Sequence, residues 1–154
     1  MRKGVIVWVA MAAILTAAAA WGDSNTLTVS ASVTGTCKFV SSSSTLNFGP
    51  LDPASAVNVN GSVNPVVQFW CTKGHTGESF DYGNGDHYAD STRNMAGPGG
   101  DLIPYTLTFT PSAGPNQGPG TPRMLTIDGS IQGSDYANKS AGSYTDIVTI
   151  TLNQ

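Results

Sequence analysis

Two histidines, His75 and His87, are the residues from which a catalytic reading of this sequence has to start. A nucleophilic hydroxyl needs a base beside it, and both histidines lie in one glycine-rich stretch, residues 74–100. The sequence has no G-x-S-x-G elbow and no H-E-x-x-H pair. We therefore predict that the protein is not an enzyme, with a Ser/His/Asp site assembled from distant positions as the remaining enzymatic alternative.

The same stretch carries oxygen ligands of the kind that calcium prefers: Asp81, Asn84, Asp86 and Asp90. Their spacing does not match an EF-hand, and Asp, Asn and Gly are also the residues of ordinary exposed turns. We therefore expect an exposed loop without metal or cofactor, and calcium binding is the alternative.

Aromatic residues in that stretch could instead form a sugar-binding or adhesive surface: Phe80, Tyr82 and Tyr88.

The two cysteines, Cys37 and Cys71, are predicted to form one disulfide. An exported chain meets an oxidising compartment, and two cysteines without a nearby histidine pair make a poor zinc site. A metal site or a reactive thiol is the alternative. Closing a loop of about 35 residues contributes roughly 3 to 4 kcal/mol in the chain-entropy model.

The N-terminus has the three regions of a secretory signal peptide. Arg2 and Lys3 precede an apolar run that ends in four alanines, so we predict a signal peptide over residues 1–20, with residue 22 as the alternative end. A retained membrane anchor is the other interpretation, because the run is nearly long enough to span a bilayer.

Cleavage removes the apolar run and leaves five basic and ten acidic residues, a net charge of −5. This charge argues against nucleic acid and anionic membrane as partners.

The remaining composition favours an all-β domain. Charged residues make up 11% of the chain, against about 25% in typical soluble domains. Serine, threonine, glycine and asparagine suit sheet faces and turns better than helices. Short strands are predicted over residues 25–35, 45–48, 62–72, 79–82, 102–110, 124–131 and 143–153. Their number and spacing indicate a β-sandwich of immunoglobulin-like size.

The strongest alternation lies at the two ends of the mature chain. In residues 25–35, apolar positions alternate strictly with serine or threonine, as in a half-buried strand: Leu27, Val29, Ala31 and Val33. Residues 143–153 repeat this pattern with Tyr144, Val148, Ile150 and Leu152.

Several segments together resemble one family, the spore coat protein U domain, which includes the subunits of archaic chaperone-usher pili. They are LTVSASVTGTC from Leu27, LNFGPLDP from Leu46, FWCTKG from Phe69, RNMAGPGGDLIPYTLT from Arg93, and the stretch from Leu125 to Leu152 that ends in AGSYTDIVTITL. The similarity covers nearly the whole mature chain. It departs from the family pattern at Trp70 and in the length of the loop over residues 74–93.

The resemblance implies an incomplete immunoglobulin-like β-sandwich that is completed by donor-strand complementation. Residues 23–35 would be the donor strand, and residues 36–154 the pilin domain. Leu27, Val29, Ala31 and Val33 would be the donor anchors. The acceptor groove, which also contacts the chaperone, would be lined by Tyr144, Val148, Ile150 and Leu152.

The partners that this resemblance implies are a periplasmic chaperone, an outer-membrane usher, and other copies of the chain or sister pilins in a linear polymer. The chain would pass through the periplasm to an extracellular pilus and serve adhesion and biofilm formation. Two alternatives come from other classes: a secreted, self-folding module that binds carbohydrate or surfaces, and a spore- or cell-coat protein assembled by packing.

Overall fold

The computed structural model describes residues 22–154, so the predicted signal peptide lies outside the described residues apart from its alternative end at residue 22. The chain divides into two units, Met1–Ser32 and Val33–Gln154. In the first unit, residues 22–32 are fully exposed and form no strand or helix. None of the helices in residues 22–154 has the length and apolar character needed to cross a bilayer.

The regular secondary structure of the second unit is almost entirely antiparallel strand, which confirms the predicted all-β, immunoglobulin-like fold. Eight strands and two short helices follow in order: β1 (Cys37–Phe39), β2 (Val59–Ser62), β3 (Val67–Cys71), β4 (Ser79–Tyr82), β5 (Arg93–Ala96), η1 (Pro98–Gly100), β6 (Leu102–Pro111), β7 (Arg123–Ile131), α1 (Gly133–Tyr136) and β8 (Ile150–Asn153).

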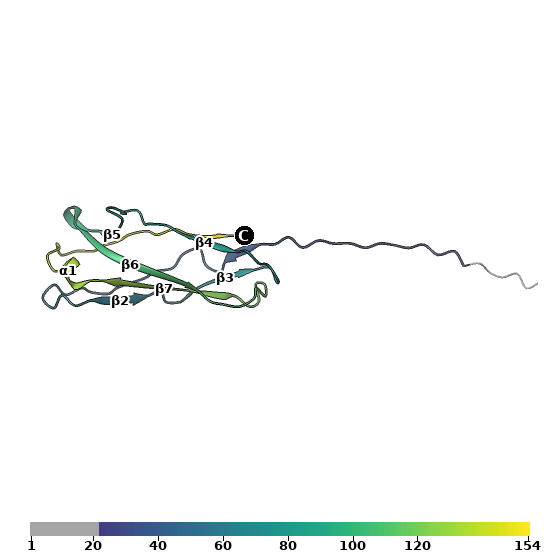
Figure 1. Ribbon diagram of the computed structural model, residues 1–154, viewed down its shortest axis with the longest axis horizontal. Coiled ribbons are helices and arrows are strands. Elements are labelled where there is room, and N and C mark those ends of the chain that lie inside the picture. Colours follow the sequence, from purple (N-terminus) through teal and green to yellow (C-terminus); the bar gives the residue numbers. More distant parts are fainter. Residues whose placement is uncertain (1–21) are drawn as a thin grey trace, which may run out of the picture. The chain divides into compact units, whose positions relative to one another are not determined.

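The larger sheet has the order β1-β3-β7-β6-β5, and β2 also pairs with β7 (Figure 1). Strands β2 and β3 pair with successive parts of β7, β2 near Ile131 and β3 near Leu125. Pro65, which cannot donate to a ladder, lies between them. The single strand predicted over residues 62–72 is therefore two strands with a break at the proline.

The second layer contains β4 and β8, which pair with each other. Its ladder continues toward β5 through an isolated bridge between Ala96 and Thr145. The strand predicted over residues 79–82 is confirmed as β4. Strand β5 was not predicted, because its mixed sequence RNMA has no period-two alternation.

Two apolar clusters fill the space between the layers. The first buries Val63, Phe69, Leu125 and Ile127 against the inward side chains of β4 and β8. The second buries Ile103, Tyr105, Ile131 and Tyr136 and is bordered by partly buried groups that include Phe48, Leu51, Met95, Tyr144 and Val148.

Residues 41–51 follow β1 without forming a strand, so the strand predicted over residues 45–48 is absent from the isolated chain. The segment is held by side-chain packing instead. Leu46 and Phe48 lie over Gly61 and Gly129, which face each other in the β2–β7 ladder. The missing side chains of these glycines make room for the segment.

The predicted disulfide is confirmed, with an S–S distance of 1.99 Å between Cys37 and Cys71. The two residues are direct partners in the β1–β3 ladder. The bond therefore fastens the first strand of the domain to the sheet.

Replacing Gly129 with alanine tests the role of the glycine pair. A Cβ atom at this position lies 2.8 Å from Cζ of Phe48, closer than packed carbon atoms approach. We expect Gly129→Ala to lower the free energy of unfolding by about 1–3 kcal/mol, the usual cost of overpacking. Equilibrium unfolding in urea measures this change.

Gly120→Ala is the matched control, since nothing lies within 4 Å of a Cβ atom there. Equal unfolding midpoints for the two variants would show that residues 45–48 are not packed against the glycines.

Candidate functional site

The last strand and the residues before it form a line of alternating inward and outward side chains. From Tyr144 to Leu152 the even-numbered residues are partly buried and the odd-numbered ones are exposed, with Ile147 67% exposed. This is the pattern predicted for residues 143–153, although only Ile150–Asn153 is a regular strand.

One edge of this terminal segment is hydrogen-bonded. Thr145 exchanges both of its backbone hydrogen bonds with Ala96, at 2.9 and 3.0 Å. Thr149 accepts from Gly83, and Ile147 accepts from Asp86. These odd-numbered residues therefore direct their backbone groups toward β4 and β5.

The opposite edge of the terminal segment is free. Within residues 22–154, no backbone hydrogen bond is made by Tyr144, Asp146 or Val148. Strand β8 likewise pairs, among the described strands, with β4 alone. The segment thus presents a row of unsatisfied backbone donors and acceptors beside an apolar core, as an edge strand does.

Residues 46–51 face this free edge and are also unpaired. Among the described residues, their one hydrogen bond from a backbone group is local, from the N–H of Gly49 to the side chain of Asn47 at 2.8 Å. Phe48 and Leu51 pack on the same apolar cluster as Tyr144 and Val148. We call the free edge of residues 144–152, together with the apolar space between Tyr144 and residues 46–51, the acceptor groove.

A cavity of about 540 Å³ opens at the end of the groove where the terminal segment begins. Its walls come from residues 46–51 and 139–144, and its apolar lining includes Phe48, Met95, Ile103, Tyr136 and Tyr144. Both walls lack backbone hydrogen bonds across the space, so an added strand could bond to each of them.

Asp146 anchors the terminal segment on its inner face. Its side chain is only 2% exposed and accepts hydrogen bonds from the Tyr105 hydroxyl at 2.5 Å and from Nδ1 of His87 at 2.9 Å. The backbone N–H of His87 donates to the same carboxylate. The segment is thereby fixed both to β6 and to the loop after β4.

These contacts keep the carboxylate ionised. Burial opposes ionisation, but the hydrogen bonds from Tyr105, His87 and Ile147 outweigh burial and lower the pKa of Asp146. Burial and the hydrogen bond to Asp146 raise the pKa of Tyr105 in turn.

The four predicted groove residues all lie along the terminal segment, but in two clusters. Tyr144 and Val148 border the second apolar cluster, and Ile150 and Leu152 border the first. The predicted donor anchors lie on the exposed extension, where Leu27, Val29 and Val33 are 83%, 84% and 85% exposed. Ala31 is also exposed, so none of the four anchors is buried in the isolated chain.

The loop residues predicted for calcium or sugar binding do not gather into one site. Asp81 accepts a hydrogen bond from Asn153, and Asn84, Asp86 and Asp90 are exposed. Phe80 and Tyr82 point into the first apolar cluster, where Tyr82 stacks on Phe109 at 4.1 Å, and only Tyr88 is exposed. The three aromatic residues therefore do not share an exposed surface.

Sequence reasoning missed two parts of the groove. The second wall, residues 46–51, received no role: only residues 45–48 were predicted as a strand, although the L-x-F-G pattern of residues 46–49 was noted. Asp146 lies at an inward position of an otherwise apolar alternation, and a carboxylate at such a position indicates a buried hydrogen-bond partner.

The family model of the Spore Coat Protein U domain matches residues 23–151. This range includes the exposed extension, both groove walls and most of the terminal segment. A search of curated proteins gave no match.

Asp146→Asn tests whether this carboxylate fixes the groove edge. An amide carries no charge and offers one acceptor oxygen instead of two, so we expect a loss of about 1–3 kcal/mol in unfolding free energy at pH 7. Because the pKa of Asp146 is lower in the folded protein than its unfolded value of about 3.9, its stabilisation is present above that value. The stabilisation is lost as the pH falls further, through the folded pKa.

Urea unfolding at pH 7, 5 and 3 measures the effect, and the difference between wild type and variant should shrink at the lowest pH. Asp86→Asn, at an exposed carboxylate, is the control and should change stability by less than about 0.5 kcal/mol. A pH-independent difference for Asp146→Asn would contradict the assigned role.

Proposed function

The chain belongs to the Spore Coat Protein U domain family, and from this premise we propose that it is a structural subunit of an extracellular pilus, assembled by donor-strand exchange. The family is a structural, pilin-type domain family of surface pilus or coat components rather than a family of enzymes. The donor in this proposal is the N-terminal extension, residues 25–35, of one copy. The acceptor is the groove of another copy.

The observation that carries the proposal is the groove with two unpaired backbone walls in a chain that also has a spare strand. Residues 46–51 and 144–148 both lack hydrogen-bond partners across the groove. The extension has strand-like alternation, but in the structure residues 22–35 form no strand. Adding a strand to an exposed edge satisfies such backbone groups and seats alternate side chains in pockets.

The side-chain alternation of the extension matches that of the terminal segment. In an antiparallel pair, residues directly opposite each other have side chains on the same face. Leu27, Val29, Ala31 and Val33 can therefore each lie opposite an inward, even-numbered residue of the terminal segment. Seven residues from Leu27 to Val33 span about 23 Å and nine from Tyr144 to Leu152 about 30 Å, so the anchors fit within the groove.

Burial of the anchors supplies the driving force. Each buried valine or leucine side chain contributes about 1.5–3 kcal/mol relative to exposure. New main-chain hydrogen bonds add to this and remove the cost of an unsatisfied edge.

The open groove also accounts for the proposed partners. An apolar cleft with free strand edges promotes aggregation, so a subunit in transit needs a temporary strand from a periplasmic chaperone. Replacement of that strand at an outer-membrane usher would then build the polymer. We propose surface attachment and biofilm formation as the role of the finished fibre.

Two adjacent substitutions in the extension test donor-strand exchange. Val29→Asp places a carboxylate among the inward anchors, and burying an unpaired charge is costly, so we expect at least a hundredfold loss of polymer. Ser30→Asp, one residue away on the opposite face, should leave polymer yield within a fewfold of wild type. Polymer is measured on unboiled SDS gels of the exported chain.

Equal yields for the two variants would contradict the proposal, because an assembly by surface packing does not depend on strand parity. Retention of polymer when residues 23–34 are deleted would contradict it as well.

A further inference from the structure

The backbone just before β1 is held firmly although the extension it leads to is exposed. Beyond the Cys37–Cys71 pair, the β1–β3 ladder continues by one more contact: the N–H of Thr72 donates to the carbonyl of Thr36 at 2.8 Å. The N–H of Thr36 donates back to Oγ1 of Thr72 at 3.0 Å. The same hydroxyl lies 3.4 Å from the carbonyl oxygen of Thr34.

The ring of His75 lies against Gly35, the residue between these contacts. A Cβ atom on Gly35 would lie 3.3 Å from Nδ1 of His75, so the imidazole packs on one side of the exposed glycine. Nε2 of His75 is buried and has no hydrogen-bond partner among residues 22–154, so packing contacts rather than a bond from this atom hold the ring. Successive positions from 34 to 37 are thus held by Thr72, by His75 or by the disulfide. We call this arrangement the exit clamp.

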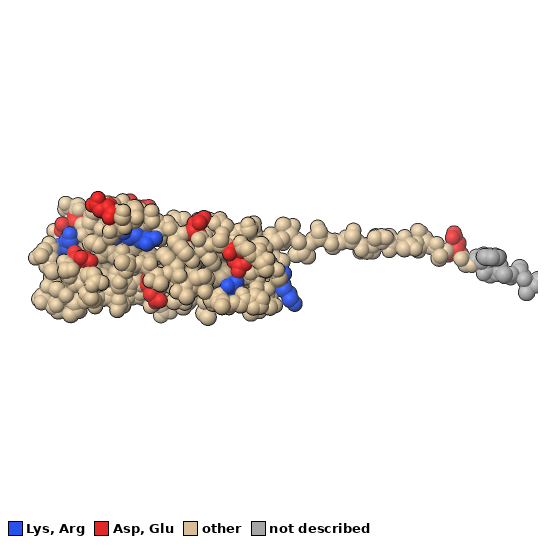
Figure 2. Space-filling view, in the orientation of Figure 1, with Lys and Arg blue, Asp and Glu red and all other residues tan. Residues whose placement is uncertain are grey.

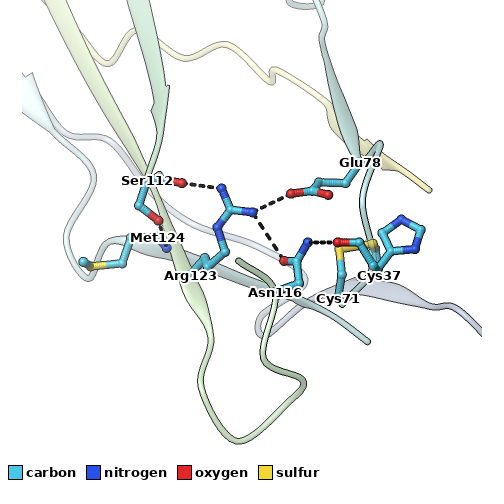
Figure 3. A network of polar contacts seen from close by, with 8 residues as sticks. Cys37, Cys71, Glu78, Ser112, Asn116, Arg123 and Met124 are labelled. Atoms are coloured by element: carbon cyan, nitrogen blue, oxygen red, sulfur yellow. Dashed lines mark hydrogen bonds and ion pairs between the residues drawn. A yellow bond between two sulfur atoms is a disulfide. The ribbon is translucent and has the colours of Figure 1, made fainter. Parts of the chain in front are cut away.

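A polar network holds the clamp in place (Figure 3). Nδ2 of Asn116 donates to the carbonyl of His75 at 2.9 Å, and the N–H of Gly74 donates to the carbonyl of Asn116. Asn116 is buried and accepts in turn from Arg123, which also pairs with Glu78 at 2.5 Å. The turn over residues 72–75 is therefore tied to the loop between β6 and β7.

The clamp fixes the course of residues 34–36 beyond the start of β1. The terminal strand ends beside β1, where the side chain of Gln154 accepts a hydrogen bond from the N–H of Cys37 at 2.9 Å. The groove wall, residues 46–51, follows β1 along the chain, whereas Thr36 extends the ladder on the other side of the Cys37–Cys71 pair. Because residues 34–36 are held along the ladder, the extension would have to reverse direction before Thr34 to enter the groove of its own domain, and such a turn would take up the anchor positions nearest the domain, Ala31 and Val33.

The extension is otherwise able to reach that groove. Eleven residues, 23–33, span about 36 Å when extended, more than the roughly 30 Å of the terminal segment from Tyr144 to Leu152. Intramolecular binding is also favoured by a high effective concentration, in the millimolar range for short flexible links. Something must prevent self-insertion if the extension is to join two copies.

We infer that the exit clamp of Thr72, His75 and the Cys37–Cys71 disulfide prevents the extension from folding back into its own groove and so directs it to a second copy of the chain. This inference rests on the proposed function and adds to it the residues that select between the two acceptors. The clamp acts by positioning the extension and does not contact the groove.

Photo-cross-linking of the full mature chain tests the clamp. A photoreactive residue replaces Thr28, the chain is refolded from guanidinium, and boiled SDS gels after irradiation separate links within one chain from links between two chains. In the wild type we expect links between chains. Thr72→Val keeps the shape of the side chain but loses the hydroxyl, and we expect it to raise links within one chain about fivefold, the value of roughly 1 kcal/mol for a lost hydrogen bond.

Thr76→Val is the matched control, because Thr76 is exposed and makes no hydrogen bond among the described residues. A Gly-Ser-Gly-Ser insertion after Val33 is the second variant. The insertion leaves every clamp contact intact but lengthens the chain between the clamp and the anchors, so it should also raise links within one chain. This variant tests the clamp even if Thr72→Val fails to fold.

The outcomes separate the two proposals. If wild-type links join two chains and neither Thr72→Val nor the insertion changes that ratio, the clamp inference is wrong and donor-strand exchange stands. If the wild type gives no links between chains in the groove, the proposed function itself fails.

Discussion

Backbone N–H and C=O groups beside an apolar core need hydrogen-bond partners, and the segment from Tyr144 to Val148 has them on one edge only. The other features of the domain follow from this constraint. The facing wall, residues 46–51, cannot supply the missing bonds, because Leu46 and Phe48 hold it over Gly61 and Gly129 rather than beside the terminal segment. The space between the two walls stays open as a groove.

Groups away from the groove keep that edge in place while it is unpaired. Asp146 binds Tyr105 and His87 from the inner face, and Thr145 binds Ala96 along the other edge. An edge fixed in this way does not need to be ordered when a strand is added, which lowers the entropic cost of binding. The sparse and scattered charge on the face of residues 33–154 shown in Figure 2 sets no strong electrostatic barrier to another copy.

Much of this arrangement could be predicted from the sequence, and the reasons for the rest are physical. Period-two alternation located β6, β7 and the terminal segment, since their side chains face a core on one side and solvent on the other. The disulfide followed from having two cysteines in an exported chain. The second wall of the groove was not recognisable, because residues 46–51 are placed by glycines more than ten positions away. The clamp was equally hidden, since Thr72 and His75 act through a turn whose position depends on Asn116 and Arg123.

The separation between donor and acceptor determines what kind of assembly can form. The extension and the groove are different surfaces of one chain, so a contact between them is heterologous: each copy gives through one surface and receives through another. Such contacts produce open filaments, or closed rings of which a reciprocally exchanged dimer is the smallest, according to the rotation between neighbours. Self-insertion is the one event that would end growth at a single copy, because it uses both surfaces at once. The contacts that hold residues 34–36, next to the disulfide that secures the first strand, therefore bear on the choice between self-insertion and polymerisation.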